Sequence, residues 1–130
     1  VPFSNDTPLA DQLRMLANHE ISLLKTEGFI TTAKVIIAEV IHSPELLDDA
    51  MVRFSPNESP LTSWFKAAAA AGTFNSEQVD FMANQFIAVI KAFCVWPQVT
   101  QNMPFPDDSE INLVTESAVD MILKQYTNRN

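Results

Sequence analysis

Apolar residues recur along the chain at intervals of three and four, which is the period of a helix face and not that of a strand. Breaks in this pattern fall at proline, glycine and clusters of asparagine, aspartate and serine. The pattern predicts helices over residues 8–27, 30–42, 44–54, 60–71, 76–96 and 109–126. The predicted fold is therefore all-α, a single helical bundle of about six helices.

Specific residues mark several of the predicted helix boundaries. We expect Thr7 to cap the first helix, with Pro8 at its first position and Gly28 at its end. Asn75 with Gln78 three residues later resembles a capping box for the fifth helix. These signals predict where the chain changes direction.

The degree of apolar character predicts how deeply each segment lies. The helix over 30–42 is so rich in isoleucine and valine that we expect it to be buried, and the helix over 76–96 has a wide apolar surface that predicts a central position. Residues 97–108 contain three prolines and are expected to form a packed loop, after which the last helix starts at Asp107 or Asp108. This last helix carries a second apolar strip, which a terminal helix in a monomer seldom needs.

Composition limits the class of protein. A chain of 130 residues that is 47% apolar suits one domain over 1–130, and its net charge of −8 disfavours binding to phosphates or DNA by this piece alone. The most apolar stretches are interrupted by charged residues, so we expect no membrane span, and a single cysteine suits a reducing, cytoplasmic setting. Because the chain starts at Val1 and not at Met, we expect it to be cut from a longer protein.

Residues that could carry catalysis or bind metal are few. Glu39 and His42 form a Glu-x-x-His pair that occurs once, whereas binuclear carboxylate sites use it twice; His19 lacks the second histidine of a zinc helix. The apolar neighbours of Cys94 are expected to raise its thiol pKa and make it a poor nucleophile. We therefore expect no enzyme, no metal site and no cofactor.

Large apolar residues remain, and the sequence leaves two interpretations open. They can form an ordinary core, or they can line an apolar ligand pocket between helices. The candidate ligand-binding residues are Met51, Phe54, Trp64, Phe65, Phe86, Ile90 and Phe93.

Several short motifs, taken in order, resemble a known family. The run VIIAEVIHSPELL at 35–47 resembles the C-terminal regulatory domains of TetR-family transcriptional repressors, particularly the AefR-like branch. The similarity continues through an alanine-rich helix ending at Gly72, then Phe74, and a helix containing MANQF at 82–86. In order, it covers roughly residues 9–126.

The resemblance implies a sensing and dimerising domain. In that family the last two long helices, here 76–96 and 109–126, would form a four-helix interface in a homodimer, and the preceding helices would hold a small apolar or amphipathic effector. DNA would be read only by an N-terminal helix-turn-helix domain that is absent before Val1, and the first helix would transmit the signal to it. The candidate interface residues are Val89, Trp96, Leu113, Val119 and Leu123.

The competing hypothesis is a stand-alone helical module that binds a partner helix through its apolar surface, with no small molecule involved.

Overall fold

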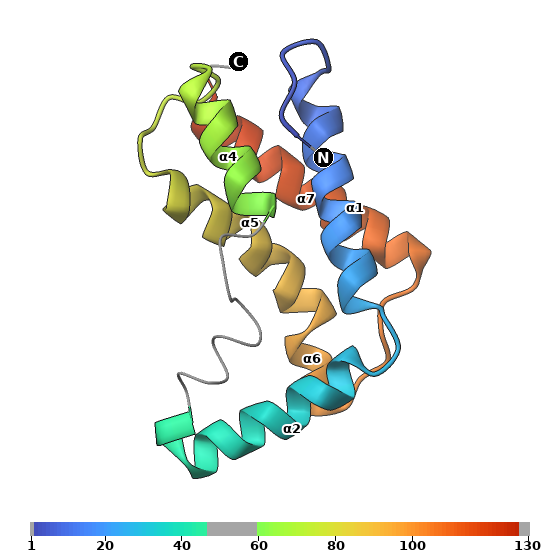
Figure 1. The fold of residues 1–130 in the computed structure, drawn as a ribbon. Helices are drawn as coiled ribbons and strands as arrows, with labels where there is room; N and C mark the ends of the chain where they lie inside the picture. Colours follow the sequence, from blue (N-terminus) through green and yellow to red (C-terminus); the bar gives the residue numbers. More distant parts are fainter. Residues whose placement is uncertain (1, 47–59, 128–130) are drawn as a thin grey trace.

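A computed structural model describes residues 2–46 and 60–127 of the chain. All regular structure in these residues is helical, which confirms the all-α prediction (Figure 1). The elements are α1 (Leu9–Leu24), α2 (Phe29–His42), the short 3-10 helix η1 (Pro44–Leu46), α4 (Pro60–Ala70), α5 (Val79–Cys94), α6 (Trp96–Gln101) and α7 (Asp108–Tyr126).

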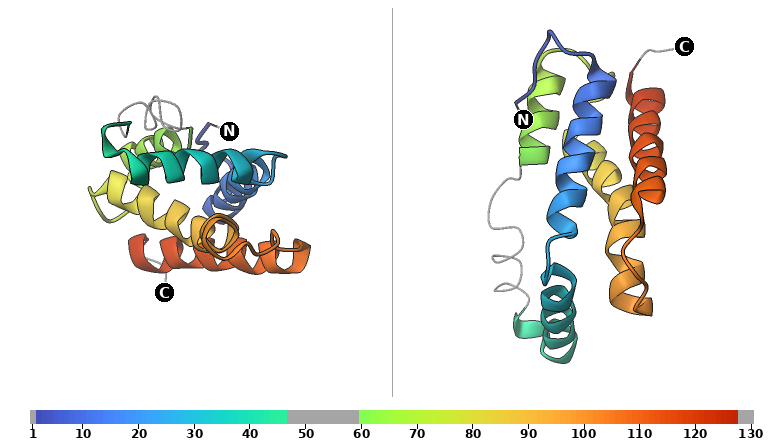
Figure 2. Two further views of the ribbon diagram at one scale, coloured as in Figure 1. Left: turned by 90° about the horizontal axis from the view of Figure 1, so that it is seen from below. Right: turned by 90° about the vertical axis from the view of Figure 1, so that its right-hand side faces the viewer.

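Helix α5 is the centre of the bundle, as its wide apolar surface predicts. It contacts α1, α4, α6 and α7. Helix α7 packs on α1 and α5 at one side of the molecule, and α4 packs on α5 at the other side (Figure 2). Helix α2 crosses the far end of the bundle, where it contacts α1 and α6 (Figure 1). The core therefore lies between α1, α4, α5 and α7.

The start of α7 is where the sequence predicts it. The side chain of Asp107 accepts a hydrogen bond from the backbone N–H of Glu110 at 2.9 Å, so Asp107 is the N-cap. Asp108 and Glu110 place two more carboxylates in the first turn, where the helix dipole favours negative charge. Local sequence alone is enough to fix this boundary.

Two other helix starts differ from the prediction. Helix α1 starts at Leu9 with Pro8 as the preceding residue, and the Thr7 side chain makes no cap; its carbonyl accepts a hydrogen bond from the Gln12 side chain instead. Helix α5 starts at Val79, not after Asn75. The backbone N–H of Asn75, the group that a capping box would pair with the Gln78 side chain, donates to the carbonyl of Tyr126 at 2.8 Å.

Residues 97–108 are not wholly a loop, because α6 occupies their first part. Helix α5 is interrupted at Val95, and Pro97 falls in the first turn of α6, where a missing N–H costs nothing. Asn102 ends α6 in the left-handed conformation, with φ of 57°. The rest of the segment packs down only in part: Pro106 is buried and Phe105 half-buried, whereas Met103 is 51% exposed.

Helix α2 has the predicted range but is not buried. Only Ala33 is buried, while Val35 and Ile41 are 54% and 75% exposed. Because α2 crosses the end of the bundle, it touches the rest of the described chain along one edge. The Lys34 ammonium donates to Asn102 Oδ1 at 2.7 Å and ties this edge to the end of α6. Of the predicted helix over 44–54, the structure describes only η1, and the remainder lies outside the described residues.

Both glycines lie at connections between helices, but Gly28 does not end the first helix as predicted. Helix α1 ends at Leu24, and Gly28 is the N-cap of α2. Gly72 follows α4 with φ of 81°, and Gly28 stands between α1 and α2 with φ of 84°. Both angles are in the left-handed region that side chains other than glycine rarely adopt.

Candidate functional site

An aromatic cluster fills one end of the bundle, and it contains three of the predicted ligand-binding residues. The ring centroids of Trp64 and Phe65 are 5.1 Å apart, and Phe65 lies 5.7 Å from Phe86 and 5.7 Å from Phe74. Phe3, from the segment before α1, packs edge-on against Trp64 at 5.7 Å. We call Phe3, Trp64, Phe65, Phe74 and Phe86 the aromatic cluster. It joins α4, α5 and the N-terminal segment.

The predicted ligand-binding residues do not form one open pocket. Trp64, Phe65 and Phe86 are at most 2% exposed and pack against one another, and Ile90 is buried one turn further along α5. Phe93 is 52% exposed near the far end of the same helix, away from the cluster. Met51 and Phe54 lie outside the described residues. In this structure Trp64, Phe65 and Phe86 are therefore core residues, as the first of the two interpretations of the sequence predicts.

Gln12 also lies at this end of the bundle, although the sequence analysis did not select it. Its side chain is 3% exposed, and its Oε1 accepts a hydrogen bond from the Trp64 indole N–H at 3.2 Å. Phe3 and Phe74 were also missed as cluster members. A single apolar or amide residue beside a helix boundary carries no periodic signal, so only their tertiary contacts reveal them.

The predicted interface residues divide between surface and core. Leu113 on α7 is 72% exposed, Trp96 is 49% exposed and Val89 is half-buried. Val119 and Leu123, in contrast, are 1% and 4% exposed and pack in the core of the chain itself. Val119 and Leu123 lie on the side of α7 that faces α1 and α5. An interface that includes Leu113 therefore does not extend to these two residues.

A shallow hollow surrounds Leu113 on the outer face of α7. Its volume is about 460 Å³, and Leu113 and Met121 supply its apolar part. Glu116, Ser117, Asp120 and Lys124 complete the lining. An apolar centre with a charged rim is typical of a surface that associates with another protein.

Helices α5 and α6 also leave apolar surface uncovered. The stretch Val79–Gln101 is long and apolar enough to cross a membrane by length and composition, yet only 33% of its most apolar window is buried inside the described structure. Its buried side includes Met82, Phe86 and Ile90 of the core, and its exposed side includes Phe81 at 55%. Lys91 lies inside this stretch and does not exclude a span by length and composition, contrary to the expectation from the sequence. The contacts of α5 with α1, α4, α6 and α7 are those of a core helix, which here has a second, exposed apolar face.

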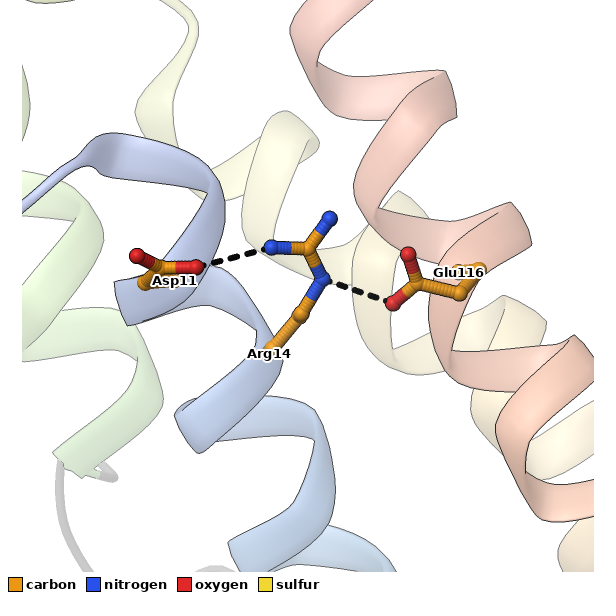
Figure 3. Close-up of polar contacts among 3 residues, drawn as sticks. All are labelled: Asp11, Arg14 and Glu116. Atoms are coloured by element: carbon orange, nitrogen blue, oxygen red, sulfur yellow. Dashed lines mark hydrogen bonds and ion pairs between the residues drawn. The ribbon is translucent and has the colours of Figure 1, made fainter.

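An ion pair connects α1 to α7 beside the α7 hollow. The Arg14 guanidinium donates from Nε to Glu116 at 2.7 Å and from a terminal nitrogen to Asp11 at 2.8 Å (Figure 3). The hydrogen bond from Arg14 lowers the pKa of the Glu116 carboxyl. All three side chains are solvent-exposed, so this contact orients the two helices and weakens with added salt.

Glu20 on α1 is half-buried, and burial raises its pKa above the ordinary carboxyl value. The charges of His19 and Lys91 oppose this shift without cancelling it. A carboxylate held partly out of water at neutral pH is a destabilising feature of the fold.

We expect Glu20→Gln to stabilise the protein at neutral pH. Because the folded-state pKa is raised, the folded chain binds this proton more tightly than the unfolded chain does, and stability is lost as pH rises through the folded pKa. The gain should therefore appear in urea denaturation at about pH 7 and vanish near about pH 3.5. Glu27→Gln, at an exposed position after α1, is the control. A lower midpoint for Glu20→Gln at pH 7 would show that the carboxylate is needed.

Cys94 lies fully in the core, and burial raises its thiol pKa to about 11, as its apolar neighbours predict. A thiol in this state is a small apolar residue and not a nucleophile. Within residues 2–46 and 60–127, no three histidine, cysteine, aspartate or glutamate side chains gather so that they could hold a metal ion.

Comparisons with known proteins relate the chain to one family. Residues 11–128 match the model of the C-terminal domain of AefR-like transcriptional repressors. The structure is similar to a crystal structure of a TetR family transcriptional regulator from Pseudomonas syringae pv. tomato str. DC3000, with 31% identity and a TM-score of 0.87. That match covers 98% of this chain and 66% of the other, so this chain spans just under two thirds of the regulator's length. A comparison with curated proteins found no match.

Proposed function

Because the chain belongs to the AefR-like C-terminal domain family of TetR transcriptional regulators, we propose that it senses an effector and dimerises within such a regulator. The observation that carries this proposal is the family match, which extends over residues 11–128. In this proposal the chain is a regulatory domain in the cytoplasm, it is not an enzyme, it requires no cofactor, and it does not act at a membrane. DNA is bound by a separate N-terminal segment of the longer protein.

The uncovered apolar surfaces of α5, α6 and α7 support the dimer. Phe81 and Val89 lie on α5, Trp96 lies at the start of α6, and Leu113 lies on α7; all but Val89 are about half exposed or more. We propose that the surface containing these residues packs against the same surface of a second copy, as the two-fold symmetry of a homodimer requires. The charged side chains around the α7 hollow would form the rim.

The effector is proposed to be a small apolar or amphipathic molecule bound near α5. Phe93 is the most accessible of the described candidates, because Trp64, Phe65, Phe86 and Ile90 are closely packed. An apolar ligand next to Phe93 would lie at the C-terminal end of α5, beside α6. Met51 and Phe54 remain candidates from the sequence.

Regulation then follows from linkage between two sites. In a two-fold dimer, the geometry of the regulatory domains sets the distance between two DNA-reading heads. One arrangement of the dimer places the two heads at the distance that DNA requires, and another does not. An effector that binds the second arrangement more tightly lowers the affinity for DNA, at most by the ratio of its affinities for the two arrangements. Helix α1 is the proposed transmitter, and the Arg14–Glu116 ion pair holds it to α7.

Nile red, a neutral apolar dye, tests the effector site. We expect the dye to bind saturably with a rise in fluorescence, and Phe93→Ala to weaken this binding about tenfold, since tenfold corresponds to the loss of one good apolar contact. Met15→Ala is the control: it removes another half-exposed apolar side chain, on α1 and outside both the proposed effector site and the proposed dimer interface. Sedimentation of the same samples reports the dimer. No saturable binding, or equal loss in both variants, would contradict the proposed site.

A further inference from the structure

The Gln12 side chain uses both of its polar atoms to hold the segment before α1. Its Nε2 donates to the carbonyls of Ser4 and Thr7, each at 2.8 Å, and its Oε1 accepts from the Ser4 backbone N–H at 3.0 Å. The same Oε1 accepts the Trp64 indole N–H at 3.2 Å. One buried amide therefore connects α1, α4 and residues 2–8, which we call the N-terminal strap.

The strap is otherwise lightly held. Phe3 packs edge-on against Trp64, and a hollow of about 340 Å³, lined by both residues and by Pro2, opens beside it. Pro2 and residues 5–8 are exposed. The hydrogen bonds of Gln12 and the packing of Phe3 on Trp64 thus hold the strap against α1 and α4.

These contacts continue into the centre of the bundle without a break. Trp64 contacts Phe65 at 5.1 Å, and Phe65 contacts Phe86 of α5 at 5.7 Å. A shift of Phe86 moves Phe65 and Trp64, because closely packed rings do not yield independently. The Trp64 indole N–H would then lose its acceptor, Gln12 Oε1. Leaving this buried donor unpaired costs free energy, which favours a matching movement of the Gln12 amide.

We propose that Gln12 is a positioning residue that couples the packing of the aromatic cluster to the placement of the N-terminal strap. The inference deepens the proposed function and rests on it in one respect: a DNA-reading segment joined ahead of this domain would meet the strap first. An effector that displaces α5 side chains would then reach that segment through Trp64 and Gln12 as well as through α1. The coupling itself is a property of this chain.

Hydrogen exchange of the Ser4 amide tests the coupling in the 130-residue protein, because that N–H donates to Gln12. We expect Gln12→Met to speed its exchange about tenfold or more, and Trp64→Phe and Phe86→Leu to speed it several-fold, as local opening becomes easier. Phe86 acts on the strap only through the cluster, so an effect of its substitution has to travel through Phe65 and Trp64. Amide spectra of α7 show that each variant keeps its fold.

Ile122→Val is the matched control, since Ile122 is fully buried on α7 outside the cluster. It lowers global stability and should leave Ser4 exchange unchanged. Equal exchange in Trp64→Phe, Phe86→Leu and this control would overturn the proposal. The exchange measurement needs neither effector nor DNA. The coupling can therefore be refuted while the chain still dimerises and binds Nile red, and it can be confirmed in a chain that does neither.

Discussion

Replacing Phe86 with alanine is expected to lower the free energy of unfolding by about 3–5 kcal/mol, the cost of removing a buried aromatic side chain and leaving a cavity. Phe86 is fully buried on the central helix α5 and contacts Phe65 of α4. A domain of this size has roughly 5–15 kcal/mol of stability in total, so this one change removes a large share of it. Urea denaturation followed by far-UV circular dichroism measures the loss.

Phe93→Ala is the control for this experiment. It removes the same side chain from the same helix, where 52% of it is exposed. We expect a loss of about 1 kcal/mol or less, because much of the ring is already in water. Similar losses for the two variants would mean that Phe86 does not occupy the packed centre.

Leu113→Asp is expected to convert a dimer at micromolar concentration into a monomer. Leu113 is 72% exposed in the isolated chain and lies in the hollow on α7 beside Glu116 and Asp120. In a two-fold interface the substitution occurs twice and buries two unpaired carboxylates among existing acidic groups. A rise of about 100-fold or more in the dimer dissociation constant follows, measured by sedimentation over a range of concentrations.

Asn112→Asp adds the same charge at the neighbouring exposed position. Its side chain points about 100° away around the helix, so it should change the dissociation constant little. An unsubstituted chain that sediments as a monomer, or a Leu113→Asp variant that dimerises normally, would refute this interface. Circular dichroism should show that both variants keep their helices, because neither position is in the core.

Local signals in the sequence predict the elements that depend on local chemistry. The apolar period gives the helices, Asp107 gives the start of α7, and Gly72 follows the end of α4. Where a boundary depends on distant residues the same reasoning fails: the backbone N–H of Asn75 donates to the carbonyl of Tyr126, and α5 starts at Val79 and not after Asn75. Competition between a local cap and a tertiary hydrogen bond cannot be decided from neighbouring residues.

Burial is predicted less well than helicity, for a related reason. The apolar character of α2 suggests a buried helix, but its place across the end of the bundle leaves Val35 and Ile41 in water. The second apolar strip on α7 is instead largely buried within the chain, because Val119 and Leu123 face α1 and α5; only Leu113 faces outward. An apolar stripe shows that a face needs a partner, and only the packing of helices shows which partner it has.

The sequence by itself determined an all-helical, acidic domain of the AefR-like C-terminal family, since helix period, charge and the order of its short motifs are local or additive properties. The tertiary structure decided which apolar residues are core, which remain exposed on α5 and α7, and that Gln12 joins the strap to Trp64. Those features depend on contacts between residues far apart in the chain, as between Gln12 and Trp64. Such contacts form only when the helices pack, and they leave no periodic trace in the chain.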